Sequence, residues 1–124
     1  MTKLINALLT PEAYSHPVDS IELLQTHISW IILTGDFAYK IKKPVNFGFL
    51  DFSSLQKRRH LCEEELRLND RYAGELYLDV VTINGSEDQP RIIGDGAVLE
   101  FAVKMQQFPS QSLLSTLLDR GDLL

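Results

Sequence analysis

The longest helical segment of the sequence, residues 53–73, carries a glutamate in the middle of its apolar face. On a helical wheel of about 100° per residue, Glu65 lies among Leu61, Cys62 and Leu66. A carboxylate that faces a protein core is costly unless a cation or several hydrogen-bond donors meet it. The sequence therefore predicts a buried partner for Glu65, and this requirement constrains the fold.

Two lysines on the strand before this helix are the candidates for that partner. Short β-rich runs predict a three-stranded antiparallel meander with a tight turn between its second and third strands. These runs are residues 21–25, 29–33 and 37–42. Strand alternation places Ala38, Lys40 and Lys42 on one face of the third strand. The pattern therefore predicts an ion pair between Glu65 and a lysine of this face, with Lys40 and Lys42 as rivals.

The remaining segments predict a mixed α+β chain with an antiparallel sheet of about five strands. The long helix is expected to begin at a capping box formed by Ser53 and Gln56, and residues 57–59 (Lys-Arg-Arg) to lie on its solvated face. A short additional strand is predicted at residues 92–93. Four leucines at helical spacing predict an amphipathic helix at the C-terminal end. The predicted helices and further strands are residues 2–9, 53–73, 76–83, 97–105 and 110–124.

Composition excludes several classes of protein. Twelve Lys plus Arg against seventeen Asp plus Glu give a net charge of -5, which argues against affinity for a phosphate backbone. No apolar run approaches the roughly 18 to 20 residues of a membrane span, and the first residues do not form a signal peptide. Cys62 is the single cysteine, and the three histidines form no cluster at zinc spacing. We expect a cytoplasmic protein that binds neither nucleic acid nor membrane.

The order of these features resembles the amino-terminal lobe of the protein-kinase-like superfamily. The shared order is two strands, a strand with Ala-x-Lys, a helix with an inward Glu, two more strands and a linker. The run ISWIILTGDFAYKIKKPVNFGFLDFSSLQKRRHLCEEELRLN, followed by LYLDVV and AVKMQQFP, resembles bacterial proteins of the aminoglycoside phosphotransferase-like family. The resemblance extends from residue 12 to the end of the chain. Some members of that family carry a P-loop kinase-type domain on their carboxy-terminal side.

The resemblance implies roles for the lysines and for Glu65. Ala38-Tyr39-Lys40 resembles the Ala-x-Lys of the third kinase strand, which places Ala38 under an adenine and Lys40 on the α and β phosphates. Lys42 stays a rival, because an alignment error of one residue pair would exchange the two roles. Glu65 resembles the helix glutamate that holds the lysine in kinases.

Three further residues receive a role from the same resemblance. Residues 26–29 take the place of the phosphate-covering loop, whose N–H groups and Ser29 hydroxyl would contact phosphate, although Gly-x-Gly-x-x-Gly is absent from the sequence. Residues 105–108 take the place of the hinge, where the backbone of Met105 and Gln107 would read the adenine edge. The implied division is an extension at 1–20, a kinase-like lobe at 21–105, and a hinge with a first helix at 106–124.

The resemblance also implies what lies outside these residues. The catalytic Asp, its Asn and the magnesium-binding Asp belong to the carboxy-terminal lobe of this superfamily. Residues 120–123 (RGDL) follow the hinge too closely to be the catalytic loop, and Asp51-Phe52-Ser53 precedes the helix that an Asp-Phe-Gly motif follows. We therefore expect an inactive nucleotide-binding fragment of a phosphotransferase. The whole enzyme would use ATP or another purine nucleotide with Mg²⁺ and a small-molecule hydroxyl acceptor.

Other interpretations remain open at this point. A buried Lys–Glu pair can simply hold a helix on a sheet, and the missing glycine loop favours a kinase-like scaffolding domain that transfers no phosphate. An unrelated α+β interaction domain is the third alternative. In a fragment of a kinase-like protein, the leucines of residues 110–124 offer an apolar surface for dimerisation, whereas the third alternative predicts a monomer.

Overall fold

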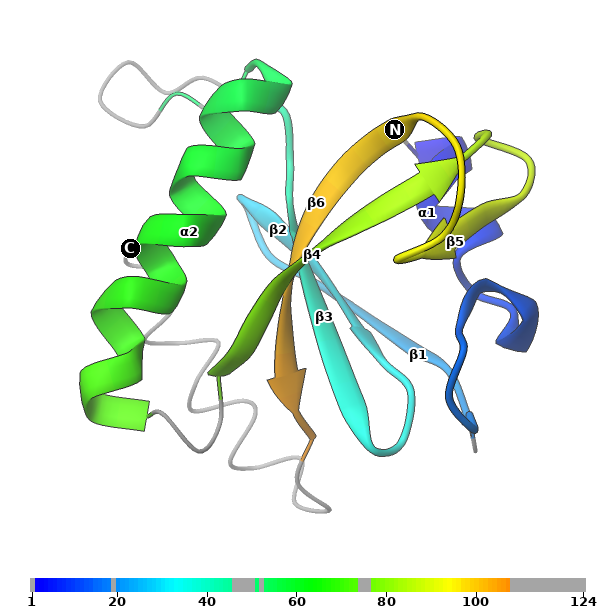
Figure 1. Ribbon diagram of the computed structural model, residues 1–124, viewed down its shortest axis with the longest axis horizontal. Helices are drawn as coiled ribbons and strands as arrows, with labels where there is room; N and C mark the ends of the chain where they lie inside the picture. The colour runs from blue at the N-terminus through cyan, green and yellow to red at the C-terminus, as the bar shows by residue number, and fades with distance from the viewer. Residues whose placement is uncertain (1, 19, 46–50, 52, 74–76, 108–124) are drawn as a thin grey trace.

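The protein folds around one six-stranded antiparallel sheet in the order β1-β2-β3-β6-β4-β5. The computed structural model describes residues 2–18, 20–45, 51, 53–73 and 77–107. The sheet is strongly twisted, with α2 along one side and α1 on the other (Figure 1). The strands are β1 (Glu22–Gln25), β2 (Ser29–Leu33), β3 (Phe37–Lys42), β4 (Tyr77–Gly85), β5 (Pro90–Ile92) and β6 (Val98–Gln106). The helices are α1 (Thr2–Ala7), the short 3₁₀-helix η1 (Pro11–Ala13) and α2 (Leu55–Ala73).

The predicted meander is confirmed. Both β2 and β3 have the predicted bounds, and β1 begins one residue later than predicted, at Glu22. Between β2 and β3, the Thr34 N–H donates to the Phe37 carbonyl at 3.0 Å. Gly35 has a φ of 111° in this turn, a conformation that a side chain disfavours. The local turn chemistry therefore sets the register of the two strands that position the lysines.

The second half of the sheet differs from the prediction in the bounds of its short strand. The predicted strands at 76–83 and 97–105 are β4 and β6, which pair with one another. The short strand lies at Pro90–Ile92 rather than at residues 92–93 and gives the sheet its sixth strand. Ile93 has a φ of 55°, so it cannot continue the extended chain, and its N–H donates to the Thr82 carbonyl at 2.8 Å.

The start of α2 is also a correction. Ser54, not Ser53, caps the helix, because the Ser54 Oγ accepts from the Lys57 N–H at 3.2 Å. Ser53 instead donates its N–H to Asp51 Oδ1 at 3.0 Å. The predicted capping box of Ser53 and Gln56 is therefore wrong. The cap lies one residue later, at Ser54, and Ser53 bonds to the Asp51 side chain instead.

Two apolar clusters lie on opposite faces of the sheet. The first joins α1 and η1 to the strands, and it includes Leu4, Ile5, Trp30, Tyr39, Ile41 and Ile83. The second lies under α2 and consists of Ile31, Leu33, Ala38, Cys62, Tyr77, Val103 and Met105. The helix predicted at residues 110–124 lies outside the described residues. The α2 face is the one that also receives charged side chains.

Candidate functional site

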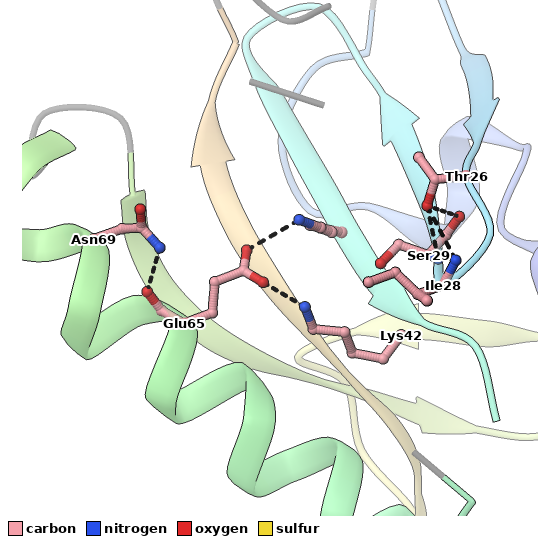
Figure 2. A network of polar contacts seen from close by, with 7 residues as sticks. Thr26, Ile28, Ser29, Lys42, Glu65 and Asn69 are labelled. Atoms are coloured by element: carbon pink, nitrogen blue, oxygen red, sulfur yellow. Dashed lines mark hydrogen bonds and ion pairs between the residues drawn. The ribbon is translucent and has the colours of Figure 1, made fainter. Parts of the chain in front are cut away.

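Glu65 of α2 meets both lysines of β3. The Lys40 Nζ lies 3.4 Å from Glu65 Oε2, and the Lys42 Nζ forms a closer ion pair and a hydrogen bond with Oε1. The three side chains are almost fully buried, with exposed fractions of 3% for Lys40, 2% for Lys42 and 3% for Glu65. Lys42 and Glu65 point toward one another between strand and helix (Figure 2). The predicted partner of Glu65 is therefore two lysines rather than one. We call these three residues the lysine–glutamate cluster.

The electrostatics of this cluster favour an ionised carboxylate. Burial by itself raises the pKa of Glu65, but the charges of Lys42 and then Lys40 outweigh it, so the pKa of Glu65 is lowered from its ordinary value. On the helix, the Asn69 Nδ2 donates to the Glu65 carbonyl at 2.8 Å. The cluster thus joins α2 to the middle of the sheet by charge as well as by packing.

A row of buried apolar side chains continues from the cluster along the sheet. Ala38 pairs with Met105 across β3 and β6, and Lys40 pairs with Val103. Ala38, Met105 and Val103 are buried, and all three belong to the apolar cluster under α2. The structure therefore brings Ala38 and Met105 onto the same face as Lys40 and Glu65.

Ser29 lies beside the cluster at the start of β2, directly across from Lys42. Ser29 is fully buried, and its Oγ has no hydrogen-bond partner among the residues that the structure describes. The loop before it is closed by Thr26, whose Oγ1 accepts from the N–H groups of Ile28 at 3.3 Å and Ser29 at 3.0 Å (Figure 2). These N–H groups are already engaged within the loop, and the Ser29 hydroxyl is the polar group that this loop adds to the site.

Gln107 lies apart from the cluster. Its Oε1 accepts from the Gly35 N–H at 2.9 Å, and its own N–H donates to the Asp36 carbonyl at 2.9 Å. Both bonds tie the residue after β6 to the turn between β2 and β3. The N–H of Gln107 is thus engaged within the chain. Phe108, the last residue of the predicted hinge, lies outside the described residues.

Sequence reasoning missed a second buried ion pair under α2. The Arg58 Nε lies 3.0 Å and 3.2 Å from the two carboxylate oxygens of Glu100 on β6. Arg58 is 7% exposed, so the predicted solvated face at residues 57–59 is wrong for this residue. Helical spacing carried the missing signal, because Arg58, Cys62 and Glu65 follow one another at i, i+4 and i+7 on one stripe.

Glu100 has the opposite electrostatic balance to Glu65. Its residue is fully buried, and burial raises its pKa above the ordinary value even though Arg58 and the Phe101 N–H lower it. The thiol of Cys62, which lies under α2, also has a pKa raised by burial, to about 12, and is therefore a neutral core group.

Two further features of the described residues bear on the chemistry. No group of three or more His, Cys, Asp or Glu side chains in the described ranges could hold a metal ion. No helix in the described part of the chain is long and apolar enough to cross a membrane.

Comparison with known proteins finds relatives that are longer than this chain. The uncharacterized protein Mb2027c of Mycobacterium bovis and the uncharacterized protein Rv2004c of Mycobacterium tuberculosis are each 30% identical to it over 110 residues. The match covers 86% of this chain and 20% of each relative, so the chain spans about a fifth of the length of these proteins. No family model matches the chain, and no solved structure does.

Proposed function

We propose that this chain forms the nucleotide-binding lobe of an ATP-dependent phosphotransferase that acts on a small-molecule hydroxyl, similar to the aminoglycoside phosphotransferase-like family. The observation that carries the proposal is the buried contact of Lys40 and Lys42 on β3 with Glu65 on α2. Protein kinases use a strand lysine held by a helix glutamate to bind nucleotide phosphates. The succession of three strands, a helix and further strands agrees with the order that the sequence resemblance implies.

The surroundings of the cluster fit a nucleotide. A base needs an apolar surface, and Ala38 and Met105 offer one beside Lys40. Phosphate oxygens need cations and donors, which Lys40 and the Ser29 hydroxyl supply on the same face. In this proposal Lys40 binds the phosphates, and Glu65 fixes the position of Lys40.

Magnesium enters the proposal only with the nucleotide. The carboxylate oxygens of Glu65 already face lysines, so this side chain is a poor ligand for a divalent cation. Ligands for Mg²⁺ would come from the phosphates and from residues outside the described ranges. The metal would neutralise charge that develops on the transferred phosphoryl group. The part of this lobe would be to hold and orient the nucleotide.

Nucleotide titration of the full-length protein tests the proposal. We expect ATP to bind, more tightly with Mg²⁺ than without, and Lys40→Met to weaken binding by about tenfold or more because a charge-assisted contact is lost. Arg58→Met is the matched control, since it removes a buried cation from the other ion pair under α2. Unchanged ATP affinity in both Lys40→Met and Lys42→Met would contradict the proposal.

A scaffolding domain without phosphotransfer is the second candidate. It is favoured by the loop before Ser29, where Thr26 engages N–H groups that a phosphate would otherwise use. This alternative predicts that ATP with Mg²⁺ leaves the melting temperature of the full-length protein unchanged. A rise in melting temperature with ATP concentration favours the nucleotide-binding lobe instead, because a ligand stabilises the state that binds it.

A further inference from the structure

The two lysines of the cluster do not contact Glu65 equally. Lys42 forms the shorter contact and a hydrogen bond with Oε1. Lys40 lies 3.4 Å from Oε2, and that oxygen has no hydrogen-bond partner among the described residues. The contact of Lys40 with Glu65 is therefore longer than that of Lys42, and it is the weaker of the two links.

We propose that Lys42 is a positioning residue that keeps Glu65 in place, while Lys40 is the lysine that turns from Glu65 toward the nucleotide phosphates. This inference rests on the proposed function, because it assigns separate tasks to two residues of that site. It also goes beyond a single Lys–Glu pair, because Lys42 keeps Glu65 in position when Lys40 binds the phosphates.

The charges explain why two lysines are useful. A buried carboxylate that loses its only cation becomes an uncompensated charge, and this is strongly unfavourable. When Lys40 moves to a phosphate, Glu65 still has the hydrogen bond from Lys42. The position of α2 on the sheet is then preserved while the ligand is bound. Lys42 thereby reduces the energetic cost of using Lys40 for binding.

The position of each lysine along β3 supports the same assignment. Lys40 is two residues from Ala38, which pairs with Met105, so it is the lysine nearer to the proposed surface for the base. Lys42, the last residue of β3, is two residues farther from Ala38 than Lys40 is. A nucleotide whose base rests on Ala38 would meet Lys40 before Lys42.

Titrations of the full-length protein with ATP and with adenosine, between about pH 5.5 and about pH 8.5, test this division of tasks. The charged or titratable groups that face Glu65 are Lys40 and Lys42 from β3, Cys62 from α2 and Tyr77 from β4. We expect Lys40→Met to lower ATP affinity about 10- to 100-fold at every pH and to leave adenosine binding unchanged, because only the phosphate contact is lost.

Lys42→Met should behave differently. In this variant Lys40 is the cation of the cluster that remains beside Glu65. At high pH the ionised Glu65 therefore holds Lys40 away from the phosphates, and ATP affinity falls about three- to tenfold. Burial raises the pKa of Glu65 and Lys42 lowers it more than Lys40 does, so the loss of Lys42 raises this pKa. As the pH falls and Glu65 is protonated, Lys40 is released and the affinity recovers. Wild type should show no such dependence. Lys42→Arg, which keeps a cation beside Glu65, should restore the wild-type profile, whereas a loss of packing alone would give a defect that pH does not change.

The outcomes separate this inference from the proposed function. If wild type binds no ATP, the proposed function fails, and with it the role of Lys40. The anchoring role of Lys42 is then still tested by thermal unfolding, where Lys42→Met must lower the melting temperature more than Lys40→Met does. If ATP binds but the two variants exchange their profiles, or both losses are independent of pH, the division of tasks is overturned.

Discussion

Among the described residues, two carboxylates are buried between α2 and the sheet, and they are neutralised in different ways. Glu65 meets two lysines, one on each oxygen, whereas both oxygens of Glu100 meet a single nitrogen of Arg58. The pKa of Glu65 is lowered, because two cations outweigh burial, and the pKa of Glu100 is raised, because burial outweighs one. The number of neighbouring cations, more than the depth of burial, decides which carboxylate stays firmly ionised.

The comparison also separates a structural pair from a site that can act on a ligand. Arg58 is the cation on Glu100, so moving it would leave a buried charge with less compensation. In the lysine–glutamate cluster each carboxylate oxygen faces its own lysine, so Lys42 remains beside Glu65 if Lys40 is drawn away. Of these two sites in the described part of the chain, the cluster is the one in which a second cation stays beside the carboxylate when the first is drawn to a bound anion.

The largest loss of stability is expected when the ion pair of Arg58 and Glu100 is broken. Arg58→Met should lower the free energy of unfolding by about 3 to 5 kcal/mol, because Glu100 stays buried without that cation. Urea denaturation measures the loss. The double variant Arg58→Met with Glu100→Leu is the control and should recover most of it, since an apolar pair removes both charges. If the double variant is as unstable as the single one, packing rather than charge accounts for the effect.

Substitution of either lysine of the cluster should cost less stability than substitution of Arg58. Lys40→Met or Lys42→Met should lower the free energy of unfolding by about 1 to 3 kcal/mol, because one cation remains on Glu65. The double variant should lose more than the sum of the two, and the same denaturation experiment measures this coupling. Strict additivity would mean that the lysines do not substitute for one another, and it would remove the contrast with Arg58.

The cap of α2 should have an effect of about 1 kcal/mol. Ser54→Ala removes the acceptor of the Lys57 N–H at the end of the helix that carries Arg58. We expect a small loss of stability in thermal unfolding, together with faster amide exchange in the first turn. Ser53→Ala is the matched control and should leave that turn unchanged, because Ser53 bonds to Asp51. Equal effects on exchange would assign the cap to both serines.

The subtlest expected difference is in the pH dependence of stability. Because its pKa is lowered, Glu65 stabilises the fold above its ordinary value of 4.5 and loses this contribution as the pH falls below it. Because its pKa is raised, Glu100 contributes most below 4.5 and loses this as the pH rises. Denaturation from acid to neutral pH should show the gap between wild type and Glu65→Gln narrowing toward acid. Relative to wild type, Glu100→Gln should become more stable toward neutral pH. Slopes of the same sign would contradict the comparison.

Local patterns predicted the part of the site that lies on two segments of regular period. Period-two alternation placed Lys40 and Lys42 on one face, and helical spacing placed Glu65 toward the sheet, so their contact followed from two short segments. Tertiary neighbours decided the rest. That Lys42 is closer to Glu65 than Lys40 is depends on side-chain geometry, which periodicity does not contain.

The misses have physical causes of the same kind. Arg58 looked solvated between two other basic residues, because its partner Glu100 is 42 positions away along the chain. The cap moved to Ser54 because Asp51 binds Ser53. Ile93, which the sequence pattern placed in a short strand with Ile92, turns out of the strand with a positive φ. Each outcome depends on a competing contact that a single-segment pattern does not include.

The two bonds of Gln107 make the tip of the β2–β3 turn a reporter on the far end of β6. An amide in a tight, partly exposed turn ordinarily exchanges with solvent quickly, but the Gly35 amide donates to the Gln107 side chain. Its protection therefore lasts only while the chain at Gln107 stays docked. The amide signal of Gly35 in an NMR spectrum would then report a displacement of Gln107 at the end of β6.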